Sequence, residues 1–383
     1  MSVHGSPQTT RPALSGQEDA PSTAPVVRTS ATAIASASVM LSAIADRIDA
    51  RVRSLMTSEL ARWTRVDSQL AEPVDALSAL VLAGGKRLRP AFAHWAFVGV
   101  GGDPDDTRII DAGAGLELLH TFALIHDDIM DGSRTRRGAE AIHVQFIRSH
   151  RNFKGRGEDR RFGEGAAILV GDLAFVYADI LMSTANHEAL AVFNELRVEV
   201  NIGQYLDLVG SVRGEPTLVA AQRICQYKSG KYTIERPLHL GAALAGRLDD
   251  VEAELSAYGM PLGEAFQLRD DIMGAVGDDA ITGKPVGDDL REGKPTALVA
   301  RAREVATVGQ RQLLSRIGDP QLTDDEIADL QHILRATGTV QWVEERIATL
   351  RDEAIEAIGN AGLTTGATEA LVDLAYYVTD RSH

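Results

Sequence analysis

The sequence predicts an all-α protein. From about residue 34 to the C-terminus, apolar side chains recur at the three- and four-residue spacing of amphipathic helices. No run of alternating apolar and polar residues bounded by hairpin turns stands out, so we expect essentially no β-sheet. Two Asp-Asp pairs, Asp127-Asp128 and Asp270-Asp271, lie late in long apolar helical stretches. Buried carboxylates need compensation for their charge, so these pairs are the first candidates for a functional site.

The length and the N-terminal composition predict the domain organisation. The chain has 383 residues, and we expect a tail over residues 1–33 followed by a single all-α domain over residues 34–383. The tail is rich in Ser, Thr, Pro, Ala and Gly and has few large apolar groups, which predicts disorder. Only Arg11 and Arg28 are basic there, which argues against a transit peptide, and no basic segment precedes an apolar core as in a secretory signal.

Charge and cysteine content narrow the class of protein. The net charge of −15 argues against sequence-independent nucleic-acid binding, which needs a basic face. A single cysteine, Cys225, excludes an intramolecular disulfide and fits a reducing cytoplasm. No segment approaches the ~18 unbroken apolar residues of a membrane-spanning helix. We therefore expect a cytoplasmic protein without an integral membrane segment.

The helical pattern can be followed along the chain. A first helix contains Met40, Ile44, Ile48 and Val52, and Pro73 suits the first turn of a second helix that stops near Gly84-Gly85. Further helices are expected at about 88–100, 107–131, 165–185, 188–210, 217–245, 250–275, 296–316, 324–336, 340–360 and 366–380. Segments 148–165 and 277–295 break the pattern and are expected to be loops. The first is rich in arginine and is read as a solvated loop, or alternatively as a basic flap over an anionic substrate.

The first acidic cluster has the spacing of a metal site. Asp127 and Asp131 are four residues apart and share one face of a helix, whereas Asp128 points about 100° away and is expected to play a supporting role. Acids at the C-terminal end of a helix oppose its dipole, so a cation is expected there. Mg²⁺ prefers carboxylate oxygens and commonly holds substrate phosphates as well. Arg136 and Arg137 follow at once, as suits a phosphate that touches both metal and arginine.

The second acidic cluster repeats this combination of acids and cations. Gln267 and Asp270 share one helix face, and Asp271 lies beside them. Each nearby basic residue could by itself be an ordinary solvated side chain, but together they indicate binding of phosphate groups. These basic residues are Lys86 and Arg89 in a Gly-rich turn, Lys228 in an apolar helical region, and Lys284 and Lys294 downstream of the acids.

Together the motifs resemble those of the trans-prenyl diphosphate synthases (polyprenyl synthetases) over about residues 80–300. The matching motifs are Gly-Lys-x-x-Arg-Pro at 85–90, Asp-Asp-x-x-Asp at 127–131, Arg136-Arg137-Gly138, Gly171-Asp172, Lys228-Ser229, Gln267 with Asp270-Asp271, Thr282-Gly283-Lys284 and Lys294. Several independent motifs in the family's order make chance agreement negligible. The resemblance implies an isoprenoid-synthase-type helical bundle around a central cavity, with the two acidic clusters facing each other across its mouth.

The resemblance also implies a reaction and a role for each motif. It implies a homodimeric, Mg²⁺-dependent prenyltransferase that condenses isopentenyl diphosphate with an allylic prenyl diphosphate. Asp127, Asp131 and Asp270 would hold three Mg²⁺ ions on the allylic diphosphate, supported by Asp128 and Asp271. The side chains that would contact the same diphosphate are Arg136, Lys228 and Lys284. Those that would hold isopentenyl diphosphate are Lys86, Arg89, His120, Arg137 and Lys294. Gln267 and the Lys228–Ser229 backbone would steady the allylic cation.

Two positions bear on how the chain departs from the family and on its product. Gly274 stands where many members have a third Asp, so we expect retained activity with weaker metal binding, and Asp278 or Asp279 as a replacement. In the family, bulk at the fifth and fourth positions before the first Asp sets the floor of the pocket. Phe122 and Ala123 stand there and predict a short product, geranylgeranyl diphosphate in preference to farnesyl diphosphate.

Two further classes of protein remain as alternatives. A class I terpene cyclase has a similar cavity and first acidic motif, but it needs no second diphosphate site, and Asp270-Asp271 lacks the form of its second metal motif. A non-catalytic regulatory subunit of a hetero-oligomer is the other alternative. Gly274 gives it some support, but the intact first acidic cluster argues against it.

Overall fold

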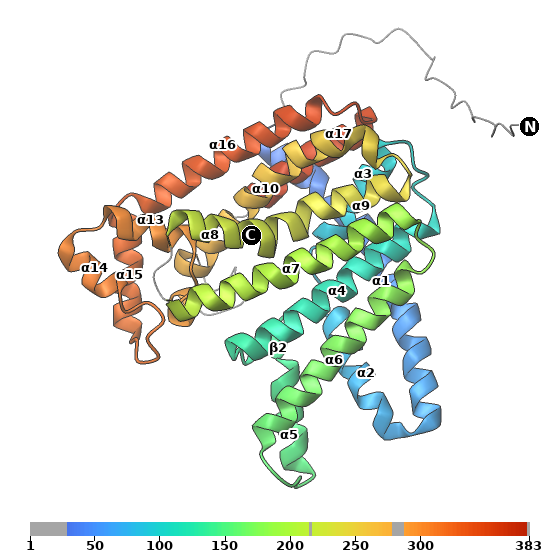
Figure 1. Cartoon of the computed structure of the whole chain (residues 1–383), viewed down its shortest axis with the longest axis horizontal. Coiled ribbons are helices and arrows are strands. Elements are labelled where there is room, and N and C mark those ends of the chain that lie inside the picture. Colours follow the sequence, from blue (N-terminus) through green and yellow to red (C-terminus); the bar gives the residue numbers. More distant parts are fainter. Residues whose placement is uncertain (1–28, 214–216, 278–286, 381–383) are drawn as a thin grey trace, which may run out of the picture.

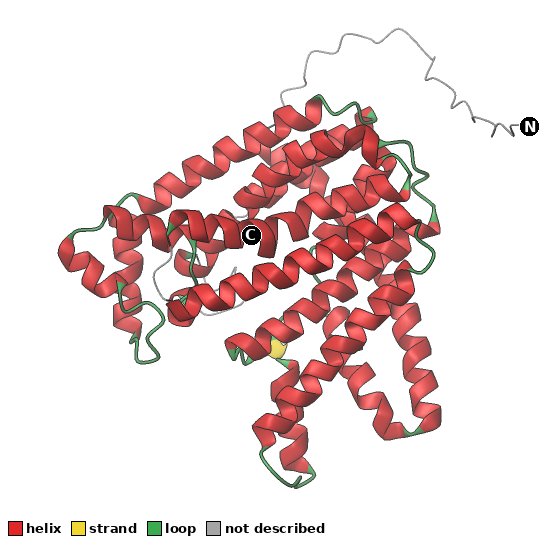
Figure 2. Cartoon of the chain, viewed as in Figure 1, coloured by secondary structure: helices red, strands yellow, loops and turns green. Residues whose placement is uncertain are grey.

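The structure is a computed structural model that describes residues 29–213, 217–277 and 287–380, and nearly all of its elements are helices (Figures 1 and 2). The first elements are α1 (Ser30–Val66), the 3-10 helix η1 (Ser68–Ala71), α2 (Glu72–Val81), α3 (Leu88–Gly99) and α4 (Thr107–Asp131). They are followed by β1 (Thr135–Arg136), β2 (Ala139–Glu140), α5 (Ile142–Asn152), α6 (Asp159–Met182), α7 (His187–Arg213), α8 (Leu218–Ile224), the π-helix η2 (Cys225–Glu235), α9 (Arg236–Leu244) and α10 (Leu248–Val276). The remaining elements are α12 (Asp288–Glu292), α13 (Ala297–Val305), α14 (Val308–Leu314), α15 (Asp324–Ala336), α16 (Thr339–Gly359) and α17 (Thr365–Thr379).

The all-α prediction is confirmed, with one small exception. β1 and β2 form a two-stranded antiparallel hairpin in which Thr135 lies opposite Glu140 and Arg136 opposite Ala139. Its two-residue turn has positive φ at both Arg137 and Gly138, as in the turns that match the twist of a hairpin. The hairpin follows directly on α4 and therefore carries the two arginines past the first acidic cluster.

Local sequence signals explain where several helices begin and end. The hydroxyl of Thr323 accepts from the backbone of Glu326, whose side chain accepts from the Thr323 backbone in return, and this capping box starts α15. Gly132, with a φ of +68°, ends α4 one residue after Asp131. The glycine stop thus fixes the first acidic cluster at the C-terminal end of its helix.

Two predicted boundaries need correction. Residues 30–33 belong to α1 rather than to the tail, because the side chain of Ala33 is buried against the bundle. The segment 148–165 is largely helical, since α5 extends to Asn152 and α6 begins at Asp159. Arg160 pairs with Glu164 one turn later, with 2.6 Å between Nε and Oε1, which supports a helix that apolar periodicity does not reveal. The arginines of this segment belong to the α5–α6 hairpin, which extends away from the rest of the bundle (Figure 1), and none of them lines the central cavity.

The bundle has two cores, and α10 and α16 contribute to both. The larger core joins α1, α3, α4, α6, α7, α9, α10 and α17 and contains the fully buried Phe92, Leu118 and Tyr258. A smaller core joins the C-terminal end of α10 to α13, α14, α15 and α16. Because α10 passes from one core to the other, Asp270 and Asp271 stand where the two cores meet.

Three helices depart from the expectation that no segment could span a membrane. By length and composition alone, α1, α4 and α6 could each cross a membrane, with mean hydropathies of 1.3, 1.2 and 1.8 over their most apolar windows. The prediction relied on unbroken apolar runs, and a single charged residue interrupts such a run. In α4, 67% of that window is buried inside the bundle, and the same helix carries the first acidic cluster.

Glycines let three helices approach closely beneath the site. A Cβ atom at Gly203 of α7 would overlap the backbone of Lys228 in η2, and one at Gly263 of α10 would overlap Gly230. The wide π-helical turn of η2 is therefore held between α7 and α10 by backbone contact. π-Helical turns are frequent at functional sites, and this one presents Lys228 and Ser229 toward both acidic clusters.

Candidate active site

A cavity of about 310 Å³ lies between α4, α7, η2, α10 and the turn that precedes α3. It brings together Asp127 and Asp270 from the two acidic clusters, although 142 intervening residues separate them in the sequence. Ten predicted site residues line it, namely Lys86, Arg89, His120, Ala123, Asp127, Arg137, Lys228, Ser229, Gln267 and Asp270. Most of the predicted site residues therefore lie together around one cavity.

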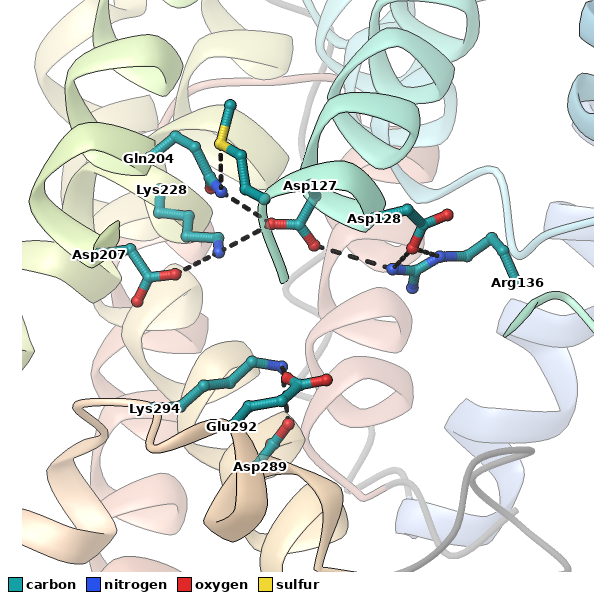
Figure 3. Close-up of polar contacts among 10 residues, drawn as sticks. Asp127, Asp128, Arg136, Gln204, Asp207, Lys228, Asp289, Glu292 and Lys294 are labelled. Carbon is teal, nitrogen blue, oxygen red and sulfur yellow. Dashed lines mark hydrogen bonds and ion pairs between the residues drawn. The ribbon is translucent and has the colours of Figure 1, made fainter. Parts of the chain in front are cut away.

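Asp127 lies at the centre of a polar network (Figure 3). Its Oδ1 accepts from Gln204 Nε2 at 2.8 Å and from Lys228 Nζ at 3.2 Å, and Arg136 Nη2 lies 3.7 Å from its Oδ2. Lys228 Nζ also donates to Asp207 Oδ2 at 2.6 Å. Figure 3 shows Gln204 and Lys228 approaching Asp127 from one side and Arg136 from the other. Burial opposes the charge of Asp127, but Lys228, Lys294 and Arg136 outweigh it and lower the pKa of this carboxyl group.

Asp128 has a different environment from Asp127. It is buried, and its Oδ1 accepts from Arg136 Nε at 2.9 Å. This placement agrees with the predicted rotation of Asp128 away from the Asp127–Asp131 face. Arg136 therefore spans the outer side of the cluster, from Asp128 to Asp127, and holds the β1–β2 hairpin against the end of α4.

The second acidic cluster opens onto an adjoining cavity of about 220 Å³. Gln267 Nε2 donates to Asp271 Oδ1 at 2.7 Å, and Asp271 is buried. Lys294 reaches this smaller cavity and pairs with Asp289 Oδ1 at 2.7 Å and Glu292 Oε2 at 2.8 Å. It does not line the larger cavity with Lys86 and Arg89, its predicted companions. Lys284, Asp278 and Asp279 lie outside the described residues.

Two of the carboxylic acids retain protons more readily than usual. Burial and the neighbouring Asp127 raise the pKa of Asp131 to about 7. Burial, with Asp289 and Asp270 nearby, raises the pKa of Asp271 to about 7 against the opposing hydrogen bond from Gln267. Such crowding of acids in a cavity is relieved by a divalent cation.

The donor set fits Mg²⁺ that shares its coordination with a ligand. Carboxylate oxygens from α4 and α10 are the hard donors that this ion prefers. In the part of the chain that the structure describes, no three His, Cys, Asp or Glu side chains converge closely enough to hold an ion by themselves. Ligand oxygens would have to complete the coordination, as the phosphates of a substrate do when Mg²⁺ is bound by only one or two carboxylates.

A basic cluster occupies the other side of the larger cavity. Arg89 Nη2 donates to Thr233 Oγ1 at 2.9 Å, and its guanidinium lies 4.2 Å from the centre of the Tyr232 ring. Burial, followed by the charges of Arg89 and Arg137, holds the pKa of His120 well below its usual range. Lys86 and Arg137 also face this space. Without an anion these cations repel one another, so the cluster suits a diphosphate.

The two residues predicted to set the pocket floor are placed differently. Ala123 lines the larger cavity, together with Leu124. Phe122 lies outside its lining and packs edge-on against Phe175 of α6, with 5.0 Å between ring centres. It also contacts the ring of His126 at 4.6 Å. Phe122 therefore stands behind the wall that Ala123 forms.

Several site residues were missed by the sequence reasoning. Gln204 and Asp207 contact Asp127 and Lys228, respectively, and their i, i+3 spacing on the predicted helix was an available signal. Asp289 and Glu292 follow a Gly-rich segment and gave no such pattern. Lys231, by contrast, pairs with Glu199 and Glu235 and serves the packing of η2.

Comparison with known proteins places this arrangement in a family. The family described as polyprenyl synthetase matches residues 69–335. The chain is 35% identical over 318 residues to a short chain isoprenyl diphosphate synthase of Methanothermobacter thermautotrophicus, covering 79% of this chain and 89% of the relative. It is 31% identical to a geranylgeranyl diphosphate synthase of Saccharolobus solfataricus, with coverages of 79% and 88%.

A solved structure agrees with the sequence matches. Geranylgeranyl pyrophosphate synthase from Corynebacterium glutamicum, complexed with isoprenyl diphosphate and magnesium, superposes with a TM-score of 0.83 at 35% identity. The match covers 90% of this chain and 99% of that one. The fold of this chain thus agrees with that of the solved structure over most of its length. The protein belongs to the polyprenyl synthetase family.

Proposed function

We propose that the protein is a short-chain trans-prenyl diphosphate synthase that condenses isopentenyl diphosphate with an allylic diphosphate to make geranylgeranyl diphosphate. The observation that carries the proposal is one cavity with an acidic cluster on one side and a basic cluster on the other. The acidic side suits a metal-bound diphosphate, and the basic side suits a second diphosphate without metal. A terpene cyclase uses one diphosphate and has no need of Lys86, Arg89 and Arg137 in the same cavity.

The residues of the chain have distinct tasks in this reaction. When bound, Mg²⁺ supplies positive charge to the allylic diphosphate as it leaves. Asp127, Asp131 and Asp270 would hold the metal, and three ions are expected by the resemblance. Lys228 and Arg136 add positive charge beside Asp127, where the charge of the departing diphosphate develops. Lys294 lies by Asp289 and is assigned to this allylic side, as is Lys284.

The basic side of the cavity orients the attacking substrate. Lys86, Arg89, His120 and Arg137 bind the diphosphate of isopentenyl diphosphate so that its double bond faces the allylic carbon. The double bond attacks the allylic cation to form the new carbon–carbon bond, and a proton is then lost to the departing diphosphate. Gln267 and the Lys228–Ser229 backbone steady the cation. Apolar walls such as Leu124, Val200 and Phe266 exclude the water that would quench it.

The proposal includes a cytoplasmic homodimer. α7 carries Val198, Ile202, Tyr205, Leu208 and Val212 on one exposed face, and α6 exposes Leu169, Val176 and Ile180. Apolar stripes of this kind are typical of subunit interfaces, and a second copy of the chain is the occupant that a symmetric assembly supplies. Light scattering coupled to size exclusion should give twice the chain mass of 41.1 kDa.

The test of the reaction uses purified protein with Mg²⁺ and isopentenyl diphosphate. Dimethylallyl, geranyl and farnesyl diphosphates are supplied separately, and the products are dephosphorylated and sized. Geranylgeraniol from every starter is the expected result. If farnesol were the longest product, the proposed condensation reaction would stand and the product would be farnesyl diphosphate. A hydrocarbon or cyclic alcohol would indicate a cyclase, and no product from any starter would favour the regulatory subunit. Asp127→Asn should abolish product formation, whereas Asp105→Asn, which changes an exposed acid just before α4 at the opposite end of that helix from Asp127, should not.

A further inference from the structure

We infer that Arg87 is the positioning residue of the isopentenyl diphosphate site: its buried guanidinium fixes the turn that carries Lys86 and Arg89 and neutralises Glu117 in the cavity wall. The inference rests on the proposed function, because it assigns the basic side of the cavity to that substrate. Neither the sequence motifs nor the family resemblance gave Arg87 a task.

The backbone of Arg87 is in a conformation that must be held in place. It has a φ of +48° and a ψ of +38° immediately before α3, and it follows Gly84 and Gly85 with φ values of +95° and +149°. Glycine adopts such angles freely, but for arginine the left-handed region is disfavoured and persists only where the surroundings fix it. This turn lies between Lys86 and Arg89, both of which line the cavity.

Three helices hold the side chain of Arg87. Its guanidinium is fully buried and donates from Nε to Asp49 Oδ1 of α1 at 2.9 Å, and from Nη1 to Glu117 Oε2 of α4 at 2.6 Å. Nη2 donates to the carbonyl oxygen of Val81, the last residue of α2, at 2.7 Å. The start of α3 is thereby tied to α1, α2 and α4 through one planar group, which a lysine cannot replace.

The pairing with Glu117 matters for the charge of the cavity. Glu117 is buried and is a carboxylate in the lining of the basic half of the cavity. Without a cation partner it would repel a bound diphosphate. Arg87 removes that repulsion while its own guanidinium points into the protein, which leaves Lys86, Arg89 and Arg137 for the ligand.

The same turn also bears on Arg137. A Cβ atom at Gly85 would lie 3.2 Å from both Arg87 Nη1 and Arg137 Nη2, so the two guanidinium groups flank this glycine. Arg137 Nη1 donates to the carbonyl oxygen of Leu80 at 3.0 Å, next to the residue that Arg87 holds. A displacement of Arg87 would therefore move three of the cations proposed to bind isopentenyl diphosphate.

The test compares Arg87→Met with Arg51→Met. Arg51 pairs with Asp111 at 2.6 Å and joins the same helices, α1 and α4, without touching the cavity. Arg87→Met should raise the KM for isopentenyl diphosphate about tenfold or more, because an uncompensated buried charge is left beside the ligand. The KM for the allylic diphosphate should stay within about twofold. Arg51→Met should lower the melting temperature without changing either KM.

A double variant distinguishes the loss of charge compensation at Glu117 from a simple loss of packing around residue 87. Adding Glu117→Gln to Arg87→Met removes the uncompensated charge and should recover part of the affinity for isopentenyl diphosphate, measured by calorimetry without the allylic substrate. If Arg87→Met does not fold, Arg87→Lys keeps a cation near Glu117 and should give an intermediate rise in KM. Equal rises in both KM values, or no recovery on adding Glu117→Gln, would overturn the inference about Arg87 and leave the proposed function standing. A wild-type protein that neither binds isopentenyl diphosphate nor forms product would instead overturn the proposed function.

Discussion

The carboxylate of Asp289 lies directly over the Cα atom of Gly274, in the place where a side chain of residue 274 would begin. A Cβ atom at Gly274 would overlap the Oδ2 atom of Asp289. The backbones meet there as well, because the Gly287 amide donates to the Gly274 carbonyl oxygen at 3.1 Å. α10 has no acid at position 274, and α12 supplies a carboxylate at the same spot.

We expect Asp289 to serve metal binding in place of an acid at 274. Gly274→Ala should displace the carboxylate of Asp289. The Mg²⁺ concentration needed to bind inorganic diphosphate should then rise about tenfold, as it does when a residue that supports a metal ligand is lost. Asp289→Asn should weaken Mg²⁺ binding to the same extent, and combining it with Gly274→Ala should weaken binding no further. Gly274→Asp supplies a carboxylate at position 274 itself and should bind Mg²⁺ about as well as the wild-type protein. Calorimetric titration of Mg²⁺ measures this, with Asp105→Asn, an exposed acid before α4, as the control. Equally weak binding by Gly274→Asp and Gly274→Ala would contradict the expectation.

Lys228 and Lys231 lie in the same π-helix and should respond differently to truncation. Lys228 bridges Asp127 and Asp207, so Lys228→Ala should lower kcat about a hundredfold and raise the KM for the allylic substrate. Lys231 pairs with Glu199 and Glu235 away from the cavity, so Lys231→Ala should lower the free energy of unfolding by about 1–3 kcal/mol. Steady-state kinetics and urea unfolding separate the two effects. A kinetic defect of similar size in Lys231→Ala would contradict this assignment.

The raised pKa of Asp131 predicts a pH-dependent response to metal. In the metal-free folded protein this carboxyl group holds its proton up to about pH 7, whereas in the unfolded chain it releases it near pH 4. The folded state therefore binds more protons over that interval, and stability should fall as the pH rises through it. Mg²⁺ competes with the proton, so its stabilising effect should be larger at pH 8 than at pH 6. Melting temperatures with and without Mg²⁺ and diphosphate test this, and Asp131→Asn should weaken the dependence.

The wall around Ala123 should control product length. Ala123→Phe places a ring in the cavity lining and should shorten the product to farnesyl diphosphate. Phe122→Ala removes the ring that packs between Phe175 and His126 and should lengthen the product, because space opens behind that wall. Chromatography of the dephosphorylated products reads both outcomes. An unchanged product from Phe122→Ala would exclude Phe122 from the floor.

The sequence was sufficient for features that depend on local periodicity. Helical spacing predicted α4 and placed Asp127 and Asp131 on one face with Asp128 turned away, and the structure shows Asp128 buried against Arg136. The same periodicity failed at residues 148–165, because helix ends held by ion pairs such as Arg160–Glu164 carry no apolar stripe.

The sequence by itself determined the all-α class, the family and half of the residues that line the cavity, because short motifs on regular helices keep their spacing in any fold that contains them. The tertiary structure decided which distant groups meet those residues. Each of these contacts joins residues that are far apart in the sequence. They are Gln204 with Asp127, Asp207 with Lys228, Asp289 with Gly274, and Glu117 with Arg87. Such contacts depend on how helices pack and in what register, and the sequence pattern of each helix taken alone does not contain that information.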